Sequence, residues 1–201
     1  MGIGEKGRQL LSRLKGEIMT QQLLLRNWER RDFPAYVSIV SDPKVMLPAG
    51  CEPAGDVNAA AAMFRRDLHN SDCYAIVLRE TSEVIGRIKY QADLRRFHVN
   101  SLSVGYELRR DCWGRGYMTE ALEAMVQNAF ERRKVDVIGI SHYSDNRRSQ
   151  RVIEKCGFKL EGIVRWACMR CDGKICDDVC YYMLREDYIS KQGPSEDREL
   201  A

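Results

Sequence analysis

The apolar positions of this chain follow a helical period most clearly between residues 117 and 130. Apolar side chains recur there on one face, and the other faces carry polar side chains. The apolar face comprises Tyr117, Met118, Ala121, Leu122, Met125, Val126, Ala129 and Phe130. This period predicts an amphipathic helix. The run before it, residues 101–108, predicts a strand, and Gly114-Arg115-Gly116 predicts a tight turn between the two.

Weaker patterns on either side predict the rest of the fold. Upstream, we expect strands at 22–26, 73–79 and 83–90 and helices at 29–40 and 56–69. Gly86 indicates a bulge in its strand. Downstream, we expect a strand at 135–140, a short helix capped at Asn146 and ended near Gly157, and two final strands between 159 and 185. These elements predict an α/β domain with a mixed, mostly antiparallel sheet of six to seven strands and helices on both faces.

The helix that opens directly out of the glycine turn predicts an anion site. Its first four N–H groups lack partners within the helix, and the helix dipole favours negative charge there. A dinucleotide fingerprint is excluded because residue 119 is Thr rather than Gly, and a P-loop is excluded because no Lys-Ser or Lys-Thr pair follows the turn. An ordinary strand–turn–helix, in which the glycines only permit a tight turn, is the alternative.

Two motifs at a fixed separation identify the anion more closely. W-G-x-G-Y-x-T-E-A runs from Trp113 to Ala121, and N-x-x-S-x-x-x-x-E-K-x-G-F runs from Asn146 to Phe158. Together they resemble the acetyl-CoA-binding core of the GNAT acyltransferase superfamily, closest to the Rim-type branch that acetylates the N-termini of ribosomal proteins. The likeness extends from about Thr20 to Ile189. It implies one GNAT domain at 19–190, a flexible leader at 1–18 and a polar tail at 191–201.

The resemblance also implies where acetyl-CoA binds. In the family the fourth strand splays from the fifth and the pantetheine arm lies in the gap, which implies backbone contacts from Tyr106 to Leu108 and an N–H near Leu108 that polarises the thioester carbonyl. Positive charge would come from Arg109, Arg110 and Arg115, and further contacts from Asn146 and Ser149. The pyrophosphate would lie against the backbone of Trp113, Gly114, Arg115, Gly116, Tyr117, Met118 and Thr119.

Three residues are the catalytic candidates. Ser149 would donate a proton to the departing thiolate, since the Tyr that many members carry is Ile153 here. Asn146 would orient the pantetheine or a water, and Glu107 would take the amine's proton through water. The ordinary alternatives are a helix-surface serine, a helix cap and an exposed strand residue. Ser141 stands where some relatives carry a catalytic Glu, so His142 is a further candidate base.

The implied function is an acetyl-CoA-dependent N-acetyltransferase that transfers an acetyl group to a primary amine by direct attack in a ternary complex. A protein N-terminus of the ribosomal type is the expected acceptor, and a homodimer is left open. The alternatives are an acetyltransferase for a small-molecule amine (an antibiotic, a polyamine or an amino acid) and a non-catalytic CoA-binding module. Acceptor choice would be set by the loops at 47–55 and 91–100.

Composition narrows the class of protein. With 32 Lys and Arg against 29 Asp and Glu, the net charge of +3 is far from the basic footprint of a nucleic-acid binder. No apolar run approaches the roughly 20 residues of a membrane span, and no signal peptide is visible, so we expect a cytoplasmic protein.

Reduced thiols are therefore expected for the eight cysteines. Four of them lie between 168 and 180, but Asp172-Gly173 indicates a hairpin there, and we expect no metal site.

Overall fold

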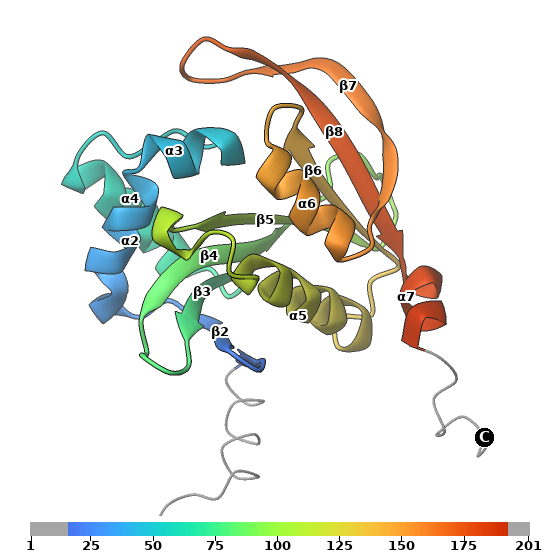
Figure 1. Cartoon of the computed structure of the whole chain (residues 1–201), viewed down its shortest axis with the longest axis horizontal. Coiled ribbons are helices and arrows are strands. Elements are labelled where there is room, and N and C mark those ends of the chain that lie inside the picture. The colour runs from blue at the N-terminus through green and yellow to red at the C-terminus, as the bar shows by residue number, and fades with distance from the viewer. Residues whose placement is uncertain (1–15, 193–201) are drawn as a thin grey trace, which may run out of the picture.

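The computed structural model describes residues 16–192, which form one twisted sheet covered by helices (Figure 1). The sheet has eight strands in the order β1-β2-β3-β4-β5-β6-β8-β7. All neighbouring pairs are antiparallel except β5 and β6, which are parallel. The strands are β1 (Ile18–Met19), β2 (Leu23–Asn27), β3 (Cys73–Leu78), β4 (Val84–Gln91), β5 (Ser101–Leu108), β6 (Val137–Tyr143), β7 (Lys159–Met169) and β8 (Ile175–Leu184).

Helices cover both faces of the sheet, as predicted. One face carries α5 (Tyr117–Glu131) and α6 (Arg147–Lys155), and the other carries α2 (Phe33–Val40), α3 (Pro43–Met46) and α4 (Val57–Leu68) (Figure 1). The last helix, α7 (Arg185–Gln192), follows β8. Single 3-10 turns occur at η1 (Arg30–Asp32), η2 (Leu47–Ala49) and η3 (Arg110–Cys112).

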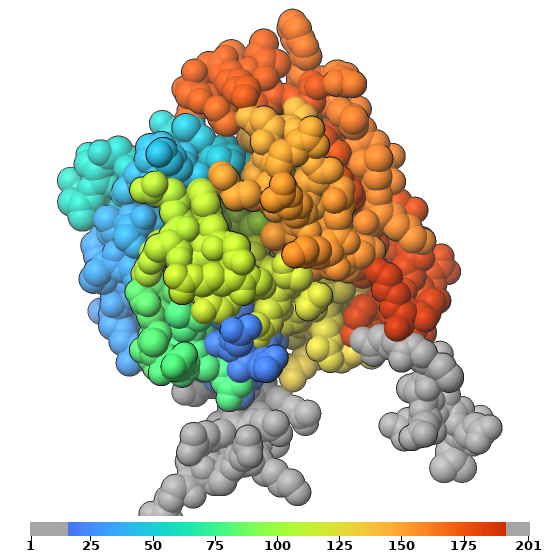
Figure 2. Space-filling model, in the orientation of Figure 1, coloured from blue at the N-terminus to red at the C-terminus, as the bar shows by residue number. Residues whose placement is uncertain are grey.

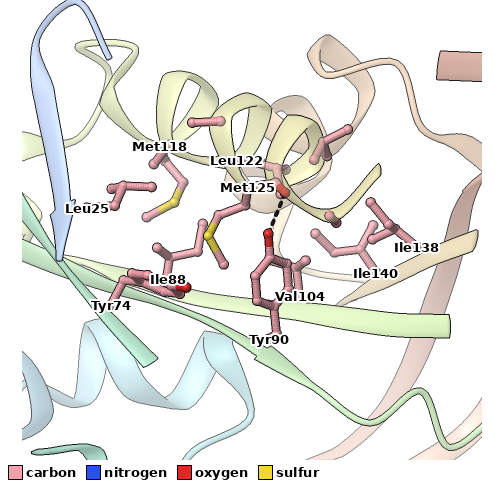
Figure 3. Packing of buried hydrophobic residues seen from close by; sticks show 14 of the residues in the cluster. Leu25, Tyr74, Ile88, Tyr90, Val104, Met118, Leu122, Met125, Ile138 and Ile140 are labelled. Atoms are coloured by element: carbon pink, nitrogen blue, oxygen red, sulfur yellow. Dashed lines mark hydrogen bonds between the residues drawn. The ribbon is translucent and has the colours of Figure 1, made fainter. Parts of the chain in front are cut away.

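The alternation of side chains along the strands produces two cores. Tyr74 and Ile76 of β3 face α5, whereas Cys73, Ala75 and Val77 of the same strand face α2 and α4. The α5 core holds the helix close to the sheet, with Met118, Leu122 and Met125 packed on Leu25, Ile88 and Val104 (Figure 3). Inside this core the Tyr90 hydroxyl donates a hydrogen bond of 2.5 Å to the Met125 carbonyl (Figure 3). This packing fixes the position of the α5 N-terminus relative to β5.

Several predicted elements are confirmed. The strands predicted at 22–26, 73–79, 83–90 and 101–108 correspond to β2, β3, β4 and β5, and the helix at 56–69 is α4, where the Asp56 side chain accepts a hydrogen bond from the Ala59 N–H. The register shift between Ile76 and Val77 lies opposite Gly86 and confirms the bulge. Gly173 has a φ of +83° in the turn between β7 and β8, which confirms the final hairpin.

Other predictions need correction. The sheet has eight strands rather than six to seven, because β1, only two residues long, adds to its edge. The helix predicted at 29–40 ends at Val40 as expected, but it begins as η1 and becomes α2 only at Phe33. The short helix α3, which Asp42 caps at the Lys44 N–H, was not predicted. α7 is absent from the prediction, which ended in the strand pair. Of the predicted leader and tail, residues 1–15 and 193–201 lie outside the described residues.

The cysteines are free thiols, and Cys168 lies opposite Cys176 in the β7–β8 register. β7 ends at Met169, so Cys171 falls in the connecting turn. Among residues 16–192, no three His, Cys, Asp or Glu side chains gather as metal ligands would. Within the same range, no helix has the length and apolar character needed to cross a membrane.

Candidate functional site

β5 and β6 separate after a short stretch of pairing. Their register covers only Ser101–Ser103 against Val137–Gly139, which confirms the splayed strand pair. The Arg109 N–H donates to the Ile85 carbonyl on β4, so odd-numbered residues at this end of β5 direct their backbone groups toward β4. The backbone groups of Val104, Tyr106 and Leu108 therefore point toward β6, into the gap. An extended chain can bind along this edge as an additional strand would.

A cavity of about 920 Å³ occupies the gap and extends to the N-terminus of α5. This volume lies in the range of small-molecule sites. Figure 2 shows its opening between the yellow-green turn before α5 and the orange α6. Its walls include the sheet residues Val104 to Leu108, the turn and first residues of α5, one face of α6, the segment Pro48–Cys51 and residues Ala167 and Cys168 of β7.

The glycine turn is shaped to leave the α5 N-terminus open. Gly114 and Gly116 have φ values of +76° and +85°, which L side chains rarely adopt, and a Cβ at either position would meet no atom within 4 Å. Among residues 16–192 no side chain caps α5, and the first bond within the helix runs from the Glu120 N–H to the Gly116 carbonyl. The preceding N–H groups, including those of Tyr117, Met118 and Thr119, are therefore available to an anion at the cavity.

Trp113 connects this turn to β5, because its indole Nε1 donates a hydrogen bond of 2.8 Å to the Leu108 carbonyl. Trp113, Gly114, Gly116, Tyr117, Met118 and Thr119 all line the cavity together with Tyr106 and Leu108. The structure thus brings together most of the predicted cofactor-binding residues.

The three arginines predicted to bind the cofactor do not line the cavity. Arg109 forms ion pairs with Glu83 and Asp111, and it lowers the pKa of Asp111 to about 2 through its hydrogen bonds. Arg110 pairs with Asp42 at 2.5 Å. Neither arginine lines the cavity, and nor does the exposed Arg115. Carboxylates of the protein therefore already neutralise two of the three guanidinium groups.

The cations that do line the cavity near the turn come from α6. They are Arg148, Arg151 and Lys155, and Arg148 stacks with its guanidinium carbon 4.0 Å from the centroid of the Trp113 ring. The prediction missed these residues. Two signals were available: the spacing of three and then four positions, which places all three on one helical face, and the place of Lys155 in the second motif.

Ser149 is buried at the cavity wall, with its Oγ 2.8 Å from the Tyr106 hydroxyl. Burial raises the pKa of Tyr106 well above its ordinary value, and the hydrogen bond to Ser149 opposes this only in part. Asn146 Oδ1 accepts a hydrogen bond from the Ser149 N–H and so caps α6, while Asn146 Nδ2 donates to the Pro48 carbonyl at 3.0 Å. Asn146 thus joins α6 to the segment on the opposite side of the cavity.

Glu107 is not the exposed strand residue that sequence left open. Its side chain is 2% exposed, and Arg87 donates to both carboxylate oxygens, at 2.7 and 2.8 Å. Burial alone would raise the pKa of Glu107, but the charge and hydrogen bonds of Arg87 outweigh it and hold the pKa below its ordinary value. A carboxylate engaged in this way is a weak base, so the predicted role in proton abstraction finds no support in the geometry.

His142 lines the cavity, but its side chain is buried. Its Nδ1 donates to the Tyr143 carbonyl at 2.7 Å. Its Nε2 is buried and has no hydrogen-bond partner among the described residues, so no substrate reaches this atom without rearrangement.

The sequence of the chain matches a known protein family. A family model described as the acetyltransferase (GNAT) domain matches residues 22–159. The uncharacterised N-acetyltransferase p20 of Bacillus licheniformis is 26% identical over 85% of this chain and 97% of its own length.

Solved structures share the fold. The spermidine N-acetyltransferase of Vibrio cholerae, determined with CoA and spermine, superposes with a TM-score of 0.72 at 17% identity, over 85% of this chain and 99% of that one. A candidate ribosomal-protein-serine acetyltransferase from Vibrio cholerae gives a TM-score of 0.68 at 19% identity, over 84% and 97% of the two chains. At these identities the likeness is one of fold.

The Arg87–Glu107 pair yields a stability prediction. Glu107→Gln should lower the free energy of unfolding by about 3 kcal/mol at pH 7, because it removes one of the two carboxylates that pair with the buried Arg87 guanidinium and leaves only Asp67. Glu83→Gln, which breaks a more exposed pair with Arg109, should cost less than about 1 kcal/mol. Urea unfolding of both variants measures the difference, and equal losses would contradict the role given to the buried pair.

The same pair predicts how that loss depends on pH. The folded-state pKa of Glu107 is lowered, so its stabilising contribution is fully present above the unfolded pKa of about 4.3 and is lost as pH falls through the folded value. The stability gap between wild type and Glu107→Gln should therefore narrow below about pH 4.

Proposed function

The chain belongs to the GNAT acetyltransferase family, and from that premise we propose that it acetylates a primary amine at a protein N-terminus. Its cosubstrate is acetyl-CoA. The observation that carries the proposal is the uncapped N-terminus of α5, which opens into a cavity bounded by the free edge of β5.

The residues present fit acetyl-CoA. The N–H groups of Tyr117 to Thr119 would hold the pyrophosphate, with open space above Gly114 and Gly116 for its approach. The edge of β5 from Val104 to Leu108 would hold the pantetheine arm. When bound, acetyl-CoA supplies a thioester carbonyl that an amine can attack. The Leu108 N–H is the donor in the gap that would polarise it.

Two hydroxyl groups in the cavity wall, those of Ser149 and Tyr106, would transfer the proton. We assign proton donation toward the leaving sulfur to Ser149, which the Tyr106 hydroxyl can resupply across their 2.8 Å contact. Asn146 positions Ser149, because its Oδ1 accepts a hydrogen bond from the Ser149 backbone N–H. Because the carboxylate of Glu107 is held by Arg87, the amine's proton would leave to water in the open cavity, and Glu107 would act as a positioning residue.

The charges at the acceptor end favour a protein N-terminus over a polyamine. A polyamine needs carboxylates that are free to bind its ammonium groups. Both carboxylates that line the cavity are engaged, Glu107 by Arg87 and Asp178 by Arg95. Lys44 and Lys89 line the same cavity and would repel a polycation.

The border of the cavity also suits a polypeptide. Trp166 and Met169 are 77% and 74% exposed on the strand whose residues Ala167 and Cys168 line the cavity. Exposed apolar side chains beside a site are typical of surfaces that contact another protein. The fold shared with the candidate ribosomal-protein-serine acetyltransferase agrees with this choice.

The glycine turn can be tested by cofactor affinity. Replacing Gly114 and Gly116 together by alanine strains a backbone at positive φ and should displace the α5 N–H groups, which weakens acetyl-CoA binding by at least about tenfold. Isothermal titration calorimetry measures the affinity. Gly162→Ala, at an open position on β7, is the control that should bind normally. Unchanged affinity in the double variant would remove the turn from the site.

Acceptor choice can be tested by release of free CoA thiol. Wild type should release thiol with peptides that match ribosomal-protein N-termini and remain at background with spermidine. Preferred turnover of spermidine would reject a protein acceptor. Tight acetyl-CoA binding with no thiol release on any peptide, polyamine, aminoglycoside or amino acid would instead identify a non-catalytic module.

Ser149→Ala should lower kcat by about 10²-fold and leave the affinity for acetyl-CoA within about twofold of wild type. Tyr106→Phe, which keeps Ser149 but removes the hydroxyl that resupplies it, should lower kcat less and change the pH profile. Ser144→Ala, on an exposed neighbour, is the control. Wild-type kcat in Ser149→Ala would assign proton donation elsewhere.

A further inference from the structure

Three cavity-lining cations on α6 make no ion pair within 4 Å of any described residue. Arg148, Arg151 and Lys155 are exposed, and they differ in this respect from Arg109 and Arg110, which carboxylates neutralise. The only carboxylate on α6, Glu154, accepts instead from Gln150 and from the Tyr181 hydroxyl. This face of the helix therefore directs uncompensated positive charge at the cavity.

The cationic face lies directly beside the proposed pyrophosphate site. Arg148 stacks on Trp113 at the start of the turn, and the Cys156 thiol lies 3.7 Å from the Thr119 carbonyl at the first turn of α5. Arg151 and Lys155 lie between these two contacts along α6. Burial raises the pKa of the Cys156 thiol, and the nearby charge of Glu123 on α5 raises it further. Glu123 nevertheless forms no ion pair with Lys155. The two cations are left facing the mouth of the cavity.

The nucleotide end of acetyl-CoA carries two separate anionic groups, a pyrophosphate and a 3′-phosphomonoester. One helix N-terminus, with a few N–H groups and a partial charge, suffices for one of them. A phosphomonoester carries a charge of about −1.5 to −2 at neutral pH and calls for full positive charges. Guanidinium and ammonium groups side by side on a helix face meet that need.

We propose that Arg151 and Lys155 bind the 3′-phosphate and make the enzyme select acetyl-CoA over 3′-dephospho-acetyl-CoA. Arg148, held on the Trp113 ring, remains beside the turn and serves the pyrophosphate. The inference rests on the proposed function, because it takes the pyrophosphate to lie at Gly114 to Thr119. It adds a recognition element outside the glycine turn, built from Arg151 together with Lys155 of the second sequence motif.

Calorimetric titration of wild type and variants with both cofactors tests the proposal. Wild type should bind acetyl-CoA about tenfold or more tightly than the dephospho form, and this preference should weaken with added salt. The double variant Arg151→Ala/Lys155→Ala should lose most of the preference by binding acetyl-CoA more weakly, with its affinity for the dephospho form unchanged. Both side chains are exposed, so the melting temperature should stay at the wild-type value. Arg147→Ala is the matched control, since Arg147 hydrogen-bonds Gln150 and lies outside the cavity.

Two results would overturn the proposal. Equal affinity of wild type for the two cofactors would remove the 3′-phosphate from recognition. An equal loss for both cofactors in the double variant would make these cations a general attraction and not a phosphomonoester site. Failure of the proposed function looks different, because wild type would then bind neither cofactor.

Discussion

The early separation of β5 from β6 is the constraint on which the site depends. A parallel pair that continued along the whole length of both strands would use the backbone groups of Val104, Tyr106 and Leu108 within the sheet. Because pairing stops at Ser103, that edge is open, and the space beside it becomes a cavity. The core beneath α5 keeps the helix N-terminus at one end of this space. Asn146 and the Arg87–Glu107 pair hold its other walls together.

Charge is distributed so that the cavity accepts anions. Its two carboxylates are engaged by arginines, and its uncompensated charges are the cations of α6 together with Lys44 and Lys89. The partial positive charge at the N-terminus of α5 adds to the positive potential in the cavity. A cofactor with several phosphate charges matches this field, and a polyamine does not. The proposed mechanism assigns catalytic protonation to neutral hydroxyl groups, which a positive environment does not disable.

Local signals in the sequence predicted the framework well. The α5 period, the glycine pair and the Asn146 cap all depend on neighbours within a few positions, and each is present in the structure. Side-chain pairing was not predictable in this way. Arg110 pairs with Asp42, which lies 68 residues away, and Arg109 pairs with Glu83, which lies 26 residues away, in addition to its near neighbour Asp111. Only the Asp111 pair has a signal in the local sequence. The burial of Glu107 likewise depends on Arg87, 20 positions earlier and on another strand. β1 is too short for any period to indicate.

The most direct test of this account is a crystal structure of the chain with acetyl-CoA. The account predicts the diphosphate against the main-chain N–H groups at the start of α5 and the pantetheine arm along β5, in the wedge that β6 leaves open. Acetyl-CoA bound elsewhere, or bound in the cavity with its diphosphate away from the glycine turn, would contradict it.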